Sequence, residues 1–282
     1  MTPRRLASNA LEHKVTPYVG MTIILILLLG PIYWTLITSL KPPAEAIRWP
    51  PTYIPKGFTL NPYIDVLTRS PVPLYLLNSA IIALVTTFLV VSAAVATTYA
   101  LTRFPYKGSK AVFSGFLIVR VIPPISLLLP FYLILRQLGL INTRTSVILY
   151  TMYLTYPLSI WMLKSFFEQF PQDLIDAALI DGTTRLGALT RVVIPVIANG
   201  IAAVAVIAFL WSWIEFLAPF LFINTDALKP ITVGLYYFVG DETTYWNSLS
   251  AGAFLATLPG IIFFIFAQKY IVSGLTAGFG KE

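Results

Sequence analysis

Few residues in this sequence of 282 could carry out covalent or metal chemistry. Cysteine is absent, which excludes disulfides, iron–sulfur clusters and thiolate zinc sites. The single histidine, His13, lies next to Lys14 near the N-terminus, where we expect it to be solvated. The apolar part of the chain holds no cluster of acids, bases or metal ligands, and no Gly-x4-Gly-Lys-Ser/Thr phosphate-binding loop occurs. We therefore predict no catalytic residue, no metal site and no bound cofactor.

Two isolated charges stand out within apolar sequence. Arg120 precedes Val-Ile-Pro-Pro, and Glu215 lies in the stretch Trp-Ile-Glu-Phe-Leu-Ala-Pro. A charged side chain in the hydrocarbon region is costly unless it is paired or hydrated, so such residues are functional candidates by default. We expect Arg120 either to face a translocation pathway or to pair with Glu215. A buried pair with a purely structural role is the alternative.

The elements that must position these residues are long apolar blocks. Hydrophobic residues make up 57% of the chain and charged residues 11%, whereas soluble domains carry about 25% charged residues. About 20 helical residues cross a bilayer, and six blocks have roughly that length. They occupy approximately residues 18–40, 76–102, 111–135, 146–166, 196–223 and 248–272. The sequence thus predicts an all-α polytopic membrane protein with six transmembrane helices over residues 18–272. The first block lacks a cleavage pattern, so it is expected to be a span and not a signal peptide.

The Lys and Arg residues indicate the orientation. With both termini inside, eleven of the cations named by position fall on the cytoplasmic side and seven outside, in line with the positive-inside rule. Residues 1–17 and 273–282 are then cytoplasmic. The formal charge of +7 forms no basic stripe, so we expect contact with membrane lipid and no nucleic acid.

Prolines and small residues distinguish the blocks. Pro123, Pro124, Pro157, Pro219 and Pro259 lie inside predicted spans, where each removes a helical hydrogen bond. They indicate kinks around a pathway or ordinary tolerance of proline in membrane helices. The second block is rich in Ala, Ser and Thr, which favours close helix packing. The Pro-rich stretch between the first two blocks is expected to be an extended, turn-rich external loop.

One polar stretch, residues 166–195, is patterned but is too polar to lie in the membrane. After Phe170-Pro171, Gln172 and Asp173 are expected to open a short helix that runs to Ile180, because acids in a first turn suit the helix dipole. Asp181-Gly182 forms a turn, and Thr183 to Val193 form a second helix that Pro195 leads into the fifth span. The alternative to a docking role is an amphipathic surface helix without a partner.

This stretch resembles the signature of the permease subunits of binding-protein-dependent ABC importers. That signature is Glu-Ala-Ala, three residues, Gly, nine residues, then Ile-x-Leu-Pro. The matching positions are Asp176-Ala177-Ala178, Gly182 and Val192-Val193-Ile194-Pro195. The spacing agrees throughout, with Asp for Glu, Val for Ile and Ile for Leu. The shorter Asp176 weakens any expectation of a particular salt bridge.

A closer similarity is to the carbohydrate branch, the six-span permeases of maltose/trehalose-type importers. It rests on residues 213–219, 228–235 and 270–278. The resemblance implies a type I ABC importer permease fold that carries a sugar. It implies that residues 168–195 form a coupling segment, with contacts from Asp176, Ala177, Ala178, Asp181, Gly182 and Pro195 to a separate ATPase that uses ATP and Mg. The implied partners are a homologous second permease in a heterodimer, two cytoplasmic ATPase subunits and an extracytoplasmic sugar-binding protein, in a prokaryotic inner membrane.

Two further contacts follow from the same resemblance. The C-terminal tail would insert between the ATPases through Gly274, Leu275, Thr276, Ala277 and Gly278, and its glycines suit an extended segment; a frayed terminus is the alternative. The external loop 224–247 would reach the binding protein, with Tyr236, Tyr237 and Phe238 as candidate contacts. An interfacial aromatic belt is the other interpretation of its aromatic residues.

Three other functions are alternatives to sugar import by an ABC importer. Import of a polyol or glycerol phosphate ester is the nearest, although an anionic substrate would require more cations than Arg120 along the pathway. An ion-coupled secondary transporter would need inverted repeats and several intramembrane carboxylates, and Glu215 is the one good candidate. A membrane enzyme would need a cluster of reactive groups, which the sequence does not provide.

Overall fold

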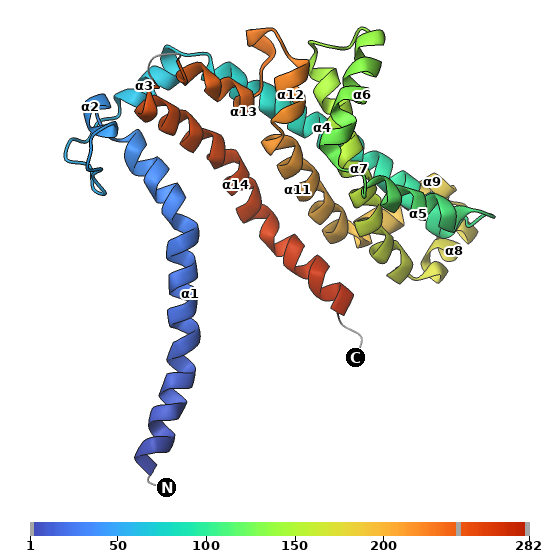
Figure 1. The fold of residues 1–282 in the computed structure, drawn as a ribbon. Coiled ribbons are helices and arrows are strands. Elements are labelled where there is room, and N and C mark those ends of the chain that lie inside the picture. The colour runs from blue at the N-terminus through green and yellow to red at the C-terminus, as the bar shows by residue number, and fades with distance from the viewer. Residues whose placement is uncertain (1–2, 241–243, 280–282) are drawn as a thin grey trace. The chain divides into compact units, whose positions relative to one another are not determined.

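Helices form nearly all of the regular structure. A computed structural model describes residues 3–240 and 244–279, and side chains within residues 17–240, 244–265 and 268. One isolated antiparallel bridge joins Val239 to Thr244. In order, the helices are α1 (Pro3–Ser39), α2 (Pro43–Ala46), α3 (Asn61–Thr68), α4 (Val72–Arg103), α5 (Ser109–Val119), α6 (Pro124–Gln137), α7 (Arg144–Gln169), α8 (Gln172–Ile180), α9 (Arg185–Ala188), the π-helix η1 (Leu189–Val193), α10 (Ile194–Val196), α11 (Ala198–Ile214), α12 (Leu217–Phe222), the 3-10 helix η2 (Asp226–Leu228), α13 (Ile231–Gly234), the 3-10 helix η3 (Leu235–Phe238) and α14 (Trp246–Phe279) (Figure 1).

Four helices in the described residues are long and apolar enough to cross a membrane. The stretches are Pro17–Ser39, Val72–Arg103, Arg144–Gln169 and Trp246–Ile265. Two more pairs of helices pass the same test together but are bent, α5 with α6 by 100° and Arg185–Val196 with α11 by 83°. By length and composition, the described chain therefore has four candidate spans, or up to six if each bent pair forms one.

The third and fifth predicted spans are not single straight helices. Pro123 and Pro124 lie at the break between α5 and α6. A proline lacks the backbone N–H and disfavours helical geometry in the residue before it, so two in succession end a helix. The fifth block, 196–223, is divided between the end of α10, α11 and α12. In contrast, Pro157 and Pro259 lie inside the continuous helices α7 and α14.

The chain divides into two compact units, residues 1–70 with 235–255, and residues 71–234 with 256–282. In the first unit, the Pro-rich loop after α1 is organised around Glu45. Its carboxylate accepts hydrogen bonds from the Thr52 hydroxyl (2.7 Å) and from the N–H groups of Lys56 (2.9 Å) and Gly57 (3.1 Å). These bonds, with that from Lys56 first, lower the pKa of Glu45 to about 2. The loop was predicted to be extended, but it is tied back on itself.

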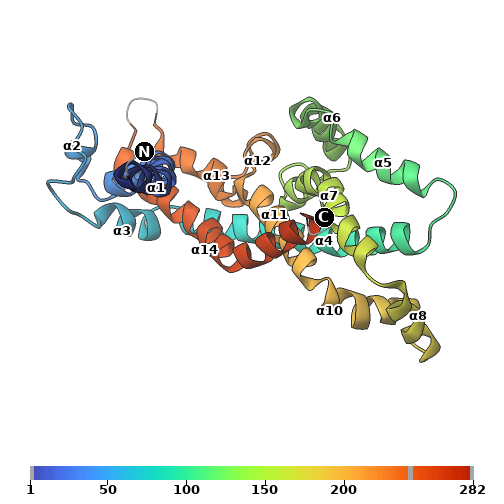
Figure 2. The same ribbon diagram turned by 90° about the horizontal axis from the view of Figure 1, so that it is seen from below.

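The second unit is built on α4, α7 and α11, which pack against one another (Figure 2). Ala83 and Ala94 of α4 are fully buried, as expected for small residues that let helix backbones approach. Gly200 of α11 faces Phe166 of α7 so closely that an added Cβ would lie 2.6 Å from the ring. The packing role predicted for the second apolar block is therefore confirmed.

Candidate functional site

The stretch after α7 forms the expected helix, turn and second helix. α8 spans Gln172–Ile180, as predicted, and Gly182 takes the left-handed conformation with φ +84°. The N–H of Thr183 donates to the carbonyl of Ala178 (3.0 Å) and closes the turn. The second helix was predicted from Thr183 but begins at Arg185, because Thr183 belongs to the turn and Thr184 caps the helix. It continues as the π-helix η1 and not as regular α-helix.

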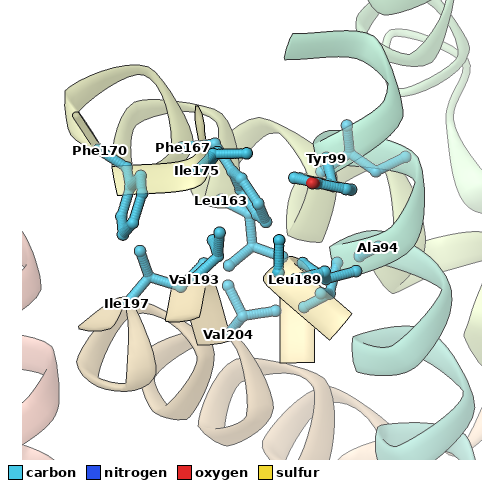
Figure 3. Packing of buried hydrophobic residues seen from close by; sticks show 13 residues of the cluster. Ala94, Tyr99, Leu163, Phe167, Phe170, Ile175, Leu189, Val193, Ile197 and Val204 are labelled. Carbon is cyan, nitrogen blue, oxygen red and sulfur yellow. The ribbon is translucent and has the colours of Figure 1, made fainter. Parts of the chain in front are cut away.

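Residues 168–195 are called the coupling segment here, after the role that the resemblance implies, and one face of this segment is anchored in the second unit. Ile175, Ala188, Leu189 and Val193 are buried in one hydrophobic cluster with residues of α4, α7 and α11. Figure 3 shows Ile175, Leu189 and Val193 converging with side chains of these helices. Fully burying an aliphatic side chain contributes about 1.5–3 kcal/mol, so the segment is held firmly to the helices that precede and follow it.

The opposite face of the segment is exposed and partly apolar. Ile180 is 86% exposed, Leu186 70% and Leu174 47%. Of the signature residues, Asp176, Ala177, Asp181, Gly182 and Pro195 are exposed, whereas Ala178 is half-buried and packs against the hydrophobic cluster. Large apolar side chains exposed together outside a membrane mark a protein-binding surface.

Arg103, the last residue of α4, was not predicted as a site residue. Its Nη2 donates to the carbonyls of Phe167 and Phe170 (2.6 Å for Phe170), at the C-terminal end of α7, and its Nη1 donates to Oε1 of Gln172 (3.0 Å). In the sequence, Arg103 contributes to the predicted orientation alone, because nothing local marks a contact across more than 60 residues.

Arg120 and Glu215 are not paired. Arg120 is exposed at the break between α5 and α6, and it lines a cavity of about 220 Å³ with Tyr153 and Trp211. Glu215 is half-buried, and its Oε1 accepts the N–H of Ala218 (3.0 Å) at the start of α12. No ion pair joins the two in the described structure, so the predicted alternative of an Arg120–Glu215 pair is wrong. A carboxylate at a helix N-terminus is stabilised by free N–H groups, which explains its position.

The first part of the 224–247 loop is tied to the second unit through Asn78. Its Nδ2 donates to the carbonyls of Ala227 and Lys229 (both 2.9 Å), and its Oδ1 accepts from Nε and Nη2 of Arg144 (3.0 and 2.8 Å). Asp226 accepts from Lys229 and from the Tyr75 hydroxyl, and these bonds lower its pKa. The segment from Asp226 to Gly234 is consequently well anchored.

The predicted contact residues further along this loop differ in exposure. Tyr236 is 62% exposed and Tyr237 is 55% exposed, whereas Phe238 is 6% exposed. Phe238 packs edge-on against Tyr237, with 5.2 Å between ring centroids. The prediction that Phe238 offers contact surface is therefore wrong, because its ring is buried, and residues 241–243 lie outside the described chain.

The C-terminal tail was predicted to be extended, but α14 continues to Phe279, so the backbone of Gly274, Leu275, Thr276, Ala277 and Gly278 is helical. α14 includes Gly274 and Gly278 although a glycine in a helix interior costs about 1 kcal/mol relative to alanine. The side chains of these five residues, and residues 280–282, lie outside the described part of the structure.

Comparison with known proteins places this geometry in a family. The family described as "Binding-protein-dependent transport system inner membrane component" matches residues 90–277, which include the whole coupling segment. The chain belongs to this family. The resemblance found at residues 176–195 is thereby confirmed, and the protein is an inner-membrane permease component and not itself an ATPase. No group of three or more metal-ligating side chains occurs in its described residues.

Individual relatives cover nearly the whole permease. It is 37% identical to the sulfoquinovosyl glycerol transport system permease SmoH of Agrobacterium fabrum, over 96% of this chain and 95% of that protein. It is 33% identical to the trehalose/maltose transport system permease MalG of Thermococcus litoralis, over 94% and 96% respectively. Each of these alignments covers more than nine tenths of both chains.

A solved structure confirms the fold. A chain of a bacterial ABC transporter involved in the import of the acidic polysaccharide alginate superposes with a TM-score of 0.81 at 18% identity, over 92% of this permease and 96% of that chain. The predicted all-α membrane architecture is therefore correct, with the two bent pairs as its departures from straight spans.

Proposed function

We propose that this permease forms part of the translocation pathway for a sugar in an ATP-driven importer, and that it couples transport to a separate ATPase through residues 168–195. The observation that carries the proposal is the coupling segment itself, which is anchored on one face and exposes Leu174, Ile180 and Leu186 on the other. A rigid segment with an apolar outer face can transmit the movement of a docked subunit as a rigid body.

The proposed mechanism requires several partner subunits. The permease pairs with a homologous second permease, binds two cytoplasmic ATPase subunits and receives substrate from an extracytoplasmic binding protein, with both termini in the cytoplasm. Asp176, Ala177, Ala178, Asp181, Gly182 and Pro195 form the ATPase contact. The family description, "binding-protein-dependent", supports the binding protein, and Tyr236 and Tyr237 are exposed on the loop that would meet it. The tail residues 274–278 are proposed to contact the ATPases as a helix.

Sugars are the proposed substrates because several relatives are named for the transport of sugars or glycosides. They include a sulfoquinovosyl glycerol, a trehalose/maltose and a diacetylchitobiose permease. A di- or oligosaccharide such as maltose or trehalose is the leading candidate, and a polyol or glycerol phosphate is the alternative. An ion-coupled mechanism is disfavoured, because Glu215 already caps α12 through the N–H of Ala218.

The cavity at the α5–α6 break is the proposed pathway contact. It combines the guanidinium of Arg120 with the aromatic side chains of Tyr153 and Trp211 and the hydroxyl-bearing Thr155. Aromatic faces suit the apolar surface of a sugar ring, and a guanidinium donates several hydrogen bonds to hydroxyl groups. Arg120→Gln should therefore reduce sugar uptake without loss of the assembled complex. Unchanged uptake would remove Arg120 from the pathway.

The test of the whole proposal is ATP-dependent uptake of labelled di- and oligosaccharides into vesicles that hold the permease with its co-encoded permease, ATPase and binding protein. Ile180→Asp adds a charge to a side chain that is 86% exposed, so it should abolish uptake and ATPase retention while the permease still folds. Tyr106→Asp, at an exposed residue outside the segment, is the matched control and should transport normally. Uptake without ATP, or normal transport by Ile180→Asp, would overturn the proposal.

A further inference from the structure

The end of α4 binds the coupling segment through hydrogen bonds from Arg103, a residue outside the family signature. Arg103 donates to the last carbonyls of α7, at Phe167 and Phe170, and to the side chain of Gln172, the first residue of α8. Its guanidinium also lies 5.7 Å from the centre of the Phe170 ring. The last carbonyls of a helix have no partner within the helix and carry its negative dipole, so a cation is well placed there.

The contact continues to the signature acid. Gln172 accepts from Arg103 through Oε1 and donates through Nε2 to Oδ1 of Asp176 (2.9 Å). Both ends of the amide are therefore used, and a continuous chain of charge-assisted hydrogen bonds runs from α4 through Gln172 to Asp176. Hydrogen bonds to ionised groups are stronger than neutral ones, so this chain resists separation of the three residues.

A second contact holds the other half of the segment to α4. Tyr99, one turn before Arg103, donates from its hydroxyl to the carbonyl of Arg185 (3.3 Å), the first residue of α9. Its ring lies 6.1 Å from that of Phe167, and the guanidinium of Arg185 lies 4.7 Å from the ring centre of Phe104. The end of α4 thus holds both α8 and α9.

We infer that Arg103 is a positioning residue that clamps the coupling segment to α4, so that movement of a docked ATPase passes directly into α4 and the helices packed on it. The inference deepens the proposed function and depends on it. A planar guanidinium can donate to two carbonyls and an amide at once, whereas a lysine ammonium cannot reproduce that fork. Loss of the clamp should leave ATP hydrolysis intact and weaken its connection to transport.

The decisive measurement is the number of ATP molecules hydrolysed per sugar imported in vesicles that contain the full transporter. For Arg103→Lys we expect this ratio to rise several-fold, because hydrolysis continues while less of it moves α4. For Gln172→Leu, which breaks the chain at an exposed residue, we expect a smaller rise. Lys110→Ala, which removes an exposed cation from the neighbouring helix α5, should keep the native ratio.

The ratio separates coupling from folding. A purely structural role of Arg103 would lower the amount of assembled transporter and leave the ratio unchanged, and that result would overturn the inference. If Arg103→Lys does not assemble, Gln172→Leu decides in the same way. Native vesicles that show no ATP-dependent uptake would refute the proposed function instead, so the two failures are distinguishable.

A second readout follows the movement itself. The chain has no cysteine, so spin labels can be attached specifically to the double variant Ala100→Cys, Thr190→Cys, whose two positions are exposed on α4 and on the coupling segment. In the native permease the distance between the two labels should be the same in the resting and ATP-bound states. In Arg103→Lys the distribution of this distance should broaden in the ATP-bound state. A native distance that changes by several ångströms between the states would show that α4 and the segment do not move as one body.

Discussion

The turn at Gly182 allows the docking role of the coupling segment to be tested quantitatively. The residue has φ +84°, a conformation that glycine adopts freely, and an added Cβ would meet no atom of this chain within 4 Å. A substitution there would therefore strain the backbone without creating a clash inside the permease. For Gly182→Ala the strain is about 1–2 kcal/mol, the usual cost of a left-handed conformation for an L-residue.

That strain should appear in the binding of the ATPase. If docking requires the turn, a cost of about 1–2 kcal/mol weakens retention of the ATPase by roughly 5- to 30-fold. Asparagine tolerates left-handed conformations better than alanine, so Gly182→Asn should bind the ATPase more tightly than Gly182→Ala. The assay is equilibrium binding of the purified ATPase to the permease complex in detergent, with each variant at equal concentration.

The order of the three residues at position 182 identifies the cause. A conformational cause gives Gly, then Asn, then Ala in decreasing affinity. A steric cause, in which the ATPase packs tightly against this position, gives Gly, then Ala, then Asn, because Asn is larger. Equal binding by the native permease and both variants would refute the view that the Gly182 turn shapes a docking surface.

Two further predictions concern Glu45, in the loop after α1, and Asn78 of α4. The pKa of Glu45 falls from 4.5 to about 2, so its stabilising effect is complete above pH 4.5 and is lost as the pH falls to about 2. Glu45→Gln should therefore raise the rate of amide exchange at Lys56 and Gly57 at pH 7, and the difference from the native permease should vanish near pH 2. Asn78→Ala removes a buried side chain with four hydrogen bonds, so it should lower the free energy of unfolding by about 1–3 kcal/mol, measured as a lower unfolding midpoint in detergent. Asn199→Ala, at an exposed position, is the control and should change the midpoint little. Equal midpoints for the two variants would contradict the anchoring role of Asn78.

The parts of the structure that depend on local sequence could be predicted. The bounds of α8 follow from Pro171 before it and Gly182 after it, and the left-handed turn follows from the need for a residue without a Cβ. The apolar blocks predicted the candidate spans, because a run of about 20 apolar residues is the length that a helix needs to cross the bilayer. A kink was one of two interpretations of Pro123-Pro124, and the prolines alone did not indicate a bend as large as 100°.

The remaining features arise from contacts between distant parts of the chain. Glu215 was expected to pair with Arg120 because both are charges in apolar sequence, yet the local N–H of Ala218 is a nearer partner for the carboxylate. Phe238 looked equivalent to Tyr236 in the sequence, but burial distinguishes them. Arg103 could not be singled out, since its partners lie 64 to 69 residues away.

The role of the signature acid follows from combining these observations. Asp176 is one methylene shorter than the glutamate of the family signature, and its Oδ1 already accepts from Gln172 four residues earlier, a helical pair that contributes about 0.2–0.5 kcal/mol. The carboxylate is therefore directed toward ordering the first turn of α8 and linking it to Arg103. The most exposed large apolar side chains of the segment are Ile180 and Leu186. Affinity for the ATPase should then come from apolar contact, while Asp176 keeps the surface that makes this contact in register with α4.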